Sequence, residues 1–382
     1  IIRMINALLT QASRDGASDI HIEPFETTSL VRFRIDGTLR DVVRPRRELH
    51  AALISRIKIM AQLDIAEKRL PQDGRITLRI GGRPMDVRVS TLPTGHGERA
   101  VLRLLDKEAG RLDLARLGMA PDTLATFDRL TRQPHGILLV TGPTGSGKTT
   151  TLYAALGRLD ATTTNILTVE DPIEYDLSGI GQTQVNPRID MTFAKALRSI
   201  LRQDPDVVMI GEIRDLETAQ IAVQASLTGH LVFSSIHAND TVGAVLRLID
   251  LGVEPFLVTS SLLAVVSQRL VRRVCSNCAE PYTPRPEVLR FWNLADTAGT
   301  VFMRGRGCYM CGDTGFRGRL GLFEILVIDE EIQEMVARRA TSREITRFAA
   351  DSGRLKLLQD DARLKILEGK TTFEEASSAV LV

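Results

Sequence analysis

The sequence predicts an α/β protein, in which a smaller N-terminal α+β domain precedes a larger domain with a mostly parallel sheet. Three observations support this fold class. Short alternating strands fill the first hundred residues, strands and helices alternate from about Leu117, and a glycine-rich loop there joins a strand to a helix. The chain has 382 residues, of which 43% are hydrophobic and 25% charged, as in ordinary globular proteins with two or three domains.

The first hundred or so residues show the mixed spacing of an α+β domain. Expected helices lie at residues 1–14 and 49–63, and expected strands lie at 19–23, 30–35, 38–40, 76–80, 85–89 and 101–105. The polar segment that follows is the best linker candidate. The predicted boundaries are 1–106 for the N-terminal domain, 107–116 for the linker and 117–382 for the second domain, with a helical C-terminus over 328–382.

The glycine-rich loop at residues 142–149 fits the pattern G-x-x-x-x-G-K-[ST] of phosphate-binding loops. An apolar run at 136–140 predicts a buried strand before the loop, and residues 150–156 predict a helix after it. Backbone N–H groups of such a loop surround phosphate oxygens at the helix N-terminus. There Lys148 can reach the β- and γ-phosphates, and the Thr149 hydroxyl can bind Mg²⁺. The predicted nucleotide-binding residues are Gly142, Pro143, Thr144, Gly145, Ser146, Gly147, Lys148, Thr149 and Thr150.

The alternative to a phosphate site is a chance glycine-rich turn. That alternative leaves the ordered strand, loop and helix unexplained. The sequence therefore predicts that the chain binds a nucleoside triphosphate such as ATP.

Acidic residues follow two further predicted strands. Glu212 ends the apolar run 205–211, a Walker B pattern, and could hold Mg²⁺ through water or orient the attacking water. Glu170 and Glu174 lie where an expected strand at 166–169 ends, and such a cluster could position a nucleophilic water. Solvated carboxylates at strand ends are the alternative, which the phosphate loop upstream makes weaker.

Two histidines, His230 and His237, bracket another expected strand at 231–236. A neutral histidine beside a γ-phosphate can donate a hydrogen bond and so report which nucleotide is bound. From spacing alone, two structural histidines with satisfied hydrogen bonds are the better explanation of the pattern.

Taken in order, these segments resemble the Walker A, Asp box, Walker B and His box of bacterial secretion ATPases, the motors of type II secretion and type IV pili. The four boxes match residues 142–149, 166–175, 204–215 and 228–239, and the segments 17–23, 34–37 and 69–75 fit the same family. The resemblance covers essentially the whole chain. It implies a RecA-like P-loop ATPase domain and a homo-hexameric ring with ATP between subunits. It also implies catalytic roles for Glu170, Glu174, Glu212, His230 and His237.

In this family's arrangement, charges from outside the motor core complete the active site. By motif position the candidates are Arg88 and Arg103 on expected N-terminal strands, together with Arg198 and Arg202 from the motor domain. Alternating arginines that merely face solvent are the alternative.

All four cysteines fall in two C-x-x-C pairs, Cys275 with Cys278 and Cys308 with Cys311. Four thiolates placed in this way are typical of a structural Zn²⁺ site. The stretch between the pairs is long and is expected to fold out as a loop, which gives a zinc-binding tetracysteine insertion over residues 270–318. Two disulfides are the alternative, and the reducing compartment expected for a nucleoside triphosphatase disfavours them.

The resemblance implies an ATP-hydrolysing motor for protein export by a type II secretion system, working with inner-membrane platform proteins at the cytoplasmic face. Pilus retraction ATPases generally lack the tetracysteine, and the run 179–186 is most similar to the type II secretion member. A pilus assembly ATPase and a nucleotide-gated switch with slow hydrolysis are the alternatives. Because the chain opens at Ile1 without an initiator Met, we expect an upstream membrane-docking segment to be missing.

Charge and composition narrow the range of partners. A net charge of +2 and an aromatic content of 4% argue against a nucleic-acid partner. Arginines gather near the cysteines and could contact anionic lipid, although a solvated surface explains them as well. These are Arg269, Arg272, Arg273, Arg304, Arg306, Arg317 and Arg319.

Overall fold

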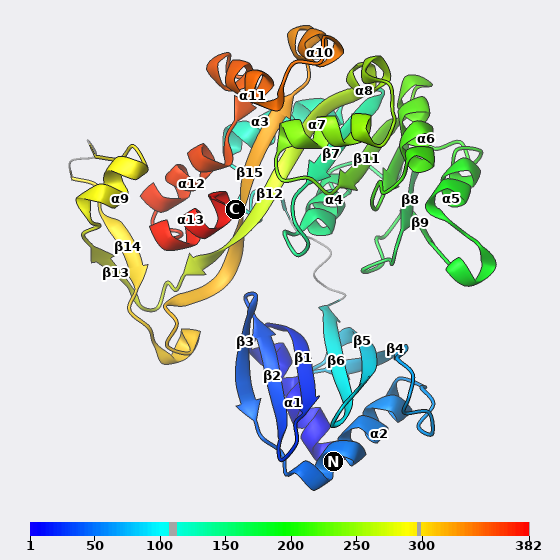
Figure 1. Cartoon of the computed structure of the whole chain (residues 1–382), viewed down its shortest axis with the longest axis vertical. Coiled ribbons are helices and arrows are strands. Elements are labelled where there is room, and N and C mark those ends of the chain that lie inside the picture. Colours follow the sequence, from blue (N-terminus) through cyan, green and yellow to red (C-terminus); the bar gives the residue numbers. More distant parts are fainter. Residues whose placement is uncertain (107–112, 296–298, 382) are drawn as a thin grey trace. The chain divides into compact units, whose positions relative to one another are not determined.

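The computed structural model describes residues 1–106, 113–295 and 299–381, and it divides the chain into two compact units, Ile1–Gly110 and Arg111–Val382 (Figure 1). Residues 107–112, most of the predicted linker, lie outside the described residues. Each unit has its own hydrophobic core and is described by itself.

The N-terminal unit is one antiparallel sheet of six strands in the order β3-β2-β1-β6-β5-β4. Its two helices pack on one face of the sheet, where Leu9, Ile20, Phe33 and Leu53 share a core. The elements are α1 (Ile2–Arg14), β1 (Ala17–Pro24), β2 (Ser29–Ile35), β3 (Thr38–Val43), α2 (His50–Met60), β4 (Gln72–Ile80), β5 (Arg83–Thr94) and β6 (Gly97–Asp106).

Because side chains alternate along each strand, polar side chains lie on the other face of this sheet, which carries no helix within residues 1–106. In β1, Ile20 and Ile22 enter the core, so the intervening Asp19, His21 and Glu23 point away from it. These three residues are nevertheless only 4–7% exposed, because neighbouring arginines cover them. Asp19, His21 and Glu23 thus belong to a network of charged side chains packed on this face of the sheet.

The second unit is a sheet of eight strands in the order β16-β15-β12-β7-β11-β10-β8-β9. The strands from β12 to β9 are parallel, whereas β15 and β16 run antiparallel at the other edge. Helices cover both faces, as Figure 1 shows in cyan to orange. Continuous apolar runs such as Gly136–Thr141, buried along its whole length, follow from this double cover.

The helices of the second unit are α3 (Pro121–Thr131), α4 (Lys148–Leu156), α5 (Phe193–Ile200), α6 (Leu216–Leu227), α7 (Thr241–Asp250), α8 (Pro255–Ser261), α9 (Pro286–Phe291), α10 (Glu330–Ala337), α11 (Ser342–Asp351), α12 (Leu358–Leu367) and α13 (Phe373–Val380). Its strands are β7 (Gly136–Thr141), β8 (Ile166–Glu170), β9 (Gly181–Gln184), β10 (Val207–Ile210), β11 (Leu231–Ile236), β12 (Leu262–Val274), β13 (Ala279–Tyr282), β14 (Phe302–Gly305), β15 (Phe316–Val327) and β16 (Leu355–Lys356).

The C-terminal stretch does not form one helical subdomain. Helices α10 and α11 pack on the main sheet, whereas α12 and α13 pack with Trp292 and Phe302 of the cysteine-rich insertion. The short strand β16 between the two pairs also adds to the main sheet. The expectation of helices over residues 328–382 therefore holds for most of the stretch but omits this strand and the division.

Candidate active site

The phosphate-binding loop begins where the central strand β7 ends and leads into α4 at Lys148. Gly142 and Gly147 have φ values of 146° and 87° in a region that favours glycine. A Cβ at Gly142 would lie 2.4 Å from the backbone oxygen of Gln268, and a Cβ at Gly147 would lie 2.9 Å from its Nε2. Glycine is therefore required both by backbone conformation and by the close approach of β12.

Gln268 of β12 lies against the phosphate loop, and no sequence pattern predicted this contact. The Thr151 hydroxyl of α4 donates to Gln268 Oε1 at 2.6 Å. Gln268 is 2% exposed, so this hydrogen bond is shielded from water. The contact ties the first turn of α4 to a strand that lies more than a hundred residues further along the chain.

Lys148 and Glu212 are electrostatically coupled across the loop. The Lys148 ammonium donates to the backbone oxygens of Gly142 at 2.8 Å and Pro143 at 3.1 Å. Burial lowers its pKa, and the negative charge of Glu212 partly opposes this shift. Phosphate oxygens would supply the anionic partners that this half-buried cation lacks in the loop itself.

Glu212 follows β10 and forms hydrogen bonds with two neighbours. Arg214 Nε donates to Glu212 Oε2 at 2.7 Å, and His237 Nε2 lies 2.7 Å from Glu212 Oε1. Because β7, β10 and β11 are parallel neighbours in the sheet, the residues at their carboxyl ends meet at one edge. The structure thus brings together Lys148, Glu212 and His237 as the sequence predicted.

His230 lies at the opposite edge of the sheet and is a correction to the predicted site. It precedes β11, next to the start of β7, and its Nδ1 lies 2.9 Å from the Ala225 backbone oxygen. The six residues of β11 span about 20 Å, at roughly 3.3 Å per residue. His230 therefore cannot reach a nucleotide held by the loop of its own subunit, and its local hydrogen bond is the structural role.

Two cavities open beside the loop. One, of about 460 Å³, is lined by Gly142, Pro143 and His237, and the other, of about 420 Å³, by Glu212, Arg214 and His237. Arg247 of α7 lines both cavities. Sequence reasoning missed this arginine, because α7 carries no motif and its position depends on how the helix packs.

The structure separates the two glutamates of the Asp box. Glu170 is 2% exposed and accepts hydrogen bonds from Tyr153 Oη, from Thr168 Oγ1 at 2.6 Å and from Gln182 Nε2 at 3.0 Å. Its carboxylate is hydrogen-bonded inside the protein, which favours an anchoring role, and its prediction as a water-orienting residue stays a prediction. Glu174 lies on the half-buried loop after β8, where its backbone N–H donates to Tyr153 Oη at 3.2 Å.

The four candidate arginines occupy defined positions within their own units. Arg88 of β5 lies opposite Arg103 of β6, whose Nε donates to Asp19 Oδ1 at 2.8 Å. Arg198 and Arg202 lie on α5, where Arg198 pairs with the exposed Glu217 at 2.7 Å. The prediction that N-terminal arginines complete the site stays a prediction.

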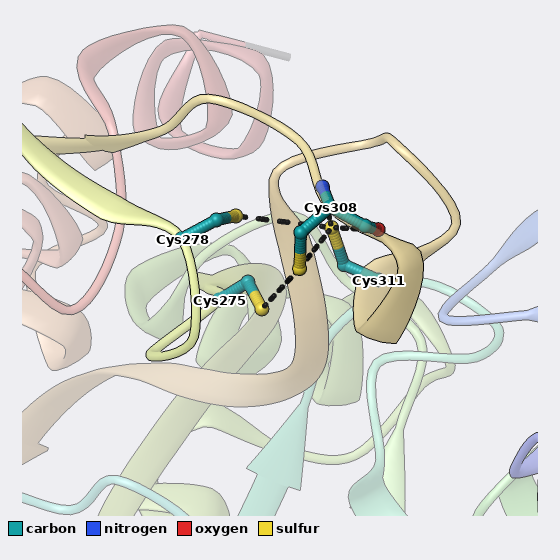
Figure 2. A group of neighbouring side chains, drawn as sticks. All are labelled: Cys275, Cys278, Cys308 and Cys311. Carbon is teal, nitrogen blue, oxygen red and sulfur yellow. Dashed lines mark hydrogen bonds between the residues drawn. The ribbon is translucent and has the colours of Figure 1, made fainter.

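The four cysteines converge on one point (Figure 2). Their Sγ atoms all lie within 4.8 Å of one another, and the pairs Cys275–Cys308, Cys278–Cys311 and Cys308–Cys311 are 3.7 to 4.0 Å apart. A tetrahedral Zn²⁺ with Zn–S bonds of about 2.3 Å needs sulfurs about 3.8 Å apart. The cysteines are free, which contradicts the disulfide alternative, and the donor set fits a zinc ion. The Asn277 amide donates to Cys308 Sγ and lowers the pKa of that thiol to about 6.

The long stretch between the two C-x-x-C pairs is folded. Strands β13 and β14 pair there as a small antiparallel sheet, and α9 stands between them in sequence. The predicted extra loop is therefore a small module, and its Trp292, which is 1% exposed, packs in a core shared with α12 and α13.

A phosphate-binding loop at the end of a central parallel strand, facing a Walker B glutamate, defines a P-loop ATPase with a RecA-like motor domain. The family model described as type II/IV secretion system protein matches residues 1–378, and the chain belongs to this family. Within the described residues, no helix is long and apolar enough to cross a membrane.

Relatives with known names agree with this assignment. The chain is 65% identical over 375 residues to the type II secretion system protein HxcR of Pseudomonas aeruginosa, covering 98% of this chain and 76% of that protein. It is 58% identical to the type II secretion system ATPase E of Vibrio cholerae, with 98% and 74% covered. The predicted function, an ATPase of a type II secretion system, is confirmed.

Solved structures show the same fold. The ATPase DotB of Legionella pneumophila matches with a TM-score of 0.73 at 21% identity, covering 98% of this chain and 94% of that chain. The pilus retraction motor PilT, solved with bound ADP, matches with a TM-score of 0.64 at 24% identity, covering 98% and 96%.

Proposed function

We propose that this chain works as a homo-hexameric motor that drives protein export from the cytoplasmic face of the inner membrane, with secretion platform proteins as its partners. The observation that carries the proposal is the convergence of Lys148, Glu212 and His237 at one edge of the parallel sheet. Two cavities adjoin this edge and share His237, so a triphosphate and its attacking water have room there.

In the proposed reaction, Lys148 neutralises charge that builds up on the β- and γ-oxygens, and Glu174 orients the attacking water. The Thr149 hydroxyl and Glu212, directly or through water, would hold Mg²⁺, which shields the phosphate charges when bound. His237 hydrogen-bonds Glu212, so it can sense whether a γ-phosphate and its ion are present.

Arg88 and Arg103 would supply further positive charge when the N-terminal domain closes on the nucleotide, with Arg198 and Arg202 as motor-domain candidates. A guanidinium held on a strand by a carboxylate, as Asp19 holds Arg103, loses little freedom when it binds phosphate. Cyclic closure of this kind would convert hydrolysis into force on the platform.

The tetracysteine module would hold one structural Zn²⁺ that takes no part in hydrolysis. Contact with anionic lipid has weaker support, because several of the arginines around the cysteines are already paired. Arg269 is 8% exposed and donates to Asn239 O, Arg272 pairs with Glu375, and Arg304 pairs with Glu280. We therefore retain lipid only as a minor candidate partner, and no nucleic-acid partner is proposed.

Steady-state hydrolysis of MgATP by the whole chain, measured with its mass in solution, tests the proposal. A motor should show turnover that a cytoplasmic domain of the platform stimulates, together with a hexameric mass. Very slow turnover that the platform leaves unchanged would instead favour a nucleotide-gated switch. Expressing the protein in a mutant that lacks its secretion ATPase, and separately in a mutant that lacks its pilus assembly ATPase, separates the two functions. Rescue of the secretion mutant alone would support protein export.

A further inference from the structure

We propose that Tyr153, on the helix that follows the phosphate loop, is a positioning residue that sets the place of Glu174. Tyr153 lies five residues after Lys148 on α4, so it moves with the helix that holds the phosphates. Its side chain is 2% exposed and its hydroxyl points to the segment that carries Glu174. This inference rests on the proposed role of Glu174 in orienting the attacking water.

The Tyr153 hydroxyl joins two parts of the Asp box. It donates to the buried carboxylate of Glu170 at the end of β8, and it accepts the Glu174 backbone N–H at 3.2 Å. Burial, followed by the hydrogen bond to Glu170, raises the pKa of Tyr153 well above its usual value, so the hydroxyl keeps its proton and remains a donor. Glu170 and Glu174, which bracket the turn after β8, are thereby both hydrogen-bonded to α4.

Two glutamines of β9 hold the rest of the same loop. Gln182 donates to Glu170 Oε1 at 3.0 Å and accepts the Leu177 N–H at 2.7 Å. Gln184 accepts the Ile173 N–H at 3.2 Å. The loop is therefore pinned on both sides of Glu174, and Tyr153 connects it to the phosphate-binding helix.

This arrangement gives the tyrosine a role beyond packing. An attacking water must lie in line with the γ-phosphate, whose position α4 determines, and Glu174 must be placed against that water. Through Tyr153, the Glu174 backbone is hydrogen-bonded to α4. The position of the water-orienting group is therefore set relative to the same helix that positions the phosphates. A loop anchored only to β8 and β9 would lack this connection.

Tyr175 provides a matched control. Its ring packs edge-on against Tyr153 with 4.7 Å between ring centroids, yet its hydroxyl bonds to no other residue that the structure describes. Tyr153→Phe and Tyr175→Phe each remove one hydroxyl from the same ring pair. The first breaks the link to Glu174, and the second leaves it intact.

The experiment compares kcat, KM and thermal midpoint for the whole chain. Tyr153→Phe should lower kcat on the order of 10- to 100-fold with KM changed less than about twofold, whereas Tyr175→Phe should keep wild-type kcat. Gln184→Ala, at an exposed position, should lower kcat more mildly, and it tests the loop anchor even if Tyr153→Phe does not fold. Wild-type kcat in a folded Tyr153→Phe would overturn the proposal, as would equal losses in the two tyrosine variants.

A double substitution separates positioning from general stability. If Tyr153 acts through Glu174, adding Tyr153→Phe to Glu174→Gln should lower kcat little further. Losses that multiply in full would mean that Tyr153 acts elsewhere and would refute the inference. Wild-type turnover in Glu174→Gln would instead remove the proposed role of Glu174 itself, which distinguishes the two failures.

Discussion

Arg88 and Arg103 lie directly opposite each other on the neighbouring strands β5 and β6. Like charges in register repel, and Asp19, in register with Arg103 on β1, offsets this through its 2.8 Å hydrogen bond. The row continues across the helix-free face of the sheet through Arg34, Asp19, Arg103, Arg88 and Arg75. Asp19 pairs with Arg103 and Asp86 pairs with Arg75, so two carboxylates against four guanidinium groups still leave an excess of positive charge suited to a phosphate.

Arg88→Ala and Arg103→Ala should each slow hydrolysis far more than the loss of a surface charge would. An arginine that stabilises the transferring phosphoryl group is worth roughly 10³ to 10⁵ in turnover. Nucleotide binding should persist, because the phosphate loop is untouched. Arg79→Ala, also exposed on the same sheet, is the control and should behave as wild type. Turnover within a few-fold of wild type in both test variants would contradict the closure model.

Lys148→Met should abolish hydrolysis without harming the fold. Burial lowers the pKa of Lys148, so the unfolded chain holds this proton more tightly than the folded one. The Lys148 charge therefore lowers the free energy of unfolding at every pH below the folded-state pKa of this lysine. This destabilisation fades as the pH rises toward the unfolded-state pKa near 10.5. The nucleotide-free variant should melt at or slightly above the wild-type temperature at pH 7, by calorimetry. Lys370→Met, which replaces an exposed lysine, is the control. A large drop in melting temperature for Lys148→Met alone would contradict the expected gain in stability.

Glu174→Gln and Glu170→Gln should fail in different ways. Glu174→Gln should bind nucleotide and keep its melting temperature while kcat falls, because only the charge near the water is lost. Glu170→Gln replaces one carboxylate oxygen with an NH₂ group, so at least one of the three donors loses its acceptor, and the change should cost about 1–3 kcal/mol of unfolding free energy. Binding, turnover and chemical denaturation of both variants check this. A stable but inactive Glu170→Gln would reverse the assignment.

The cysteine site should contain one zinc ion per chain. All four cysteines belong to it, so a thiol reagent should react slowly with the metal-bound protein and find four thiols after chelation. Cys278→Ser should lose zinc and loosen the module around Trp292, which fluorescence of this single tryptophan can follow. Elemental analysis that finds no zinc would reject the site.

The sequence predicted those features that depend on neighbours along the chain. The phosphate loop, its flanking strand and helix, and the carboxylate after β10 are local patterns, and they appear where the spacing placed them. The cysteine site was also predictable, because only one combination of four identical ligands exists.

Features that depend on strand order could not be predicted. Gln268 and Arg247 reach the nucleotide edge because β12 lies beside β7 and α7 follows β11, an order that no local spacing reveals. The prediction for His230 failed for a related reason. His230 and His237 belong to one sequence motif, but β11 lies between them and places them at opposite edges of the sheet. Glu170 ends β8 and Glu174 lies on the loop after it, and the sequence alone could not tell which of the two carboxylates is buried and hydrogen-bonded inside the protein.

Strand β12 runs without interruption from Gln268 beneath the phosphate loop to Val274, next to Cys275. Along most of that length it is hydrogen-bonded to β15, so the two strands form a stiff ribbon. Cys275 lies seven positions after Gln268, about 23 Å along an extended chain. Paired strands, and not an irregular segment, therefore connect the residue beneath the phosphate loop to the first cysteine of the zinc site, so the two sites belong to one piece of regular secondary structure.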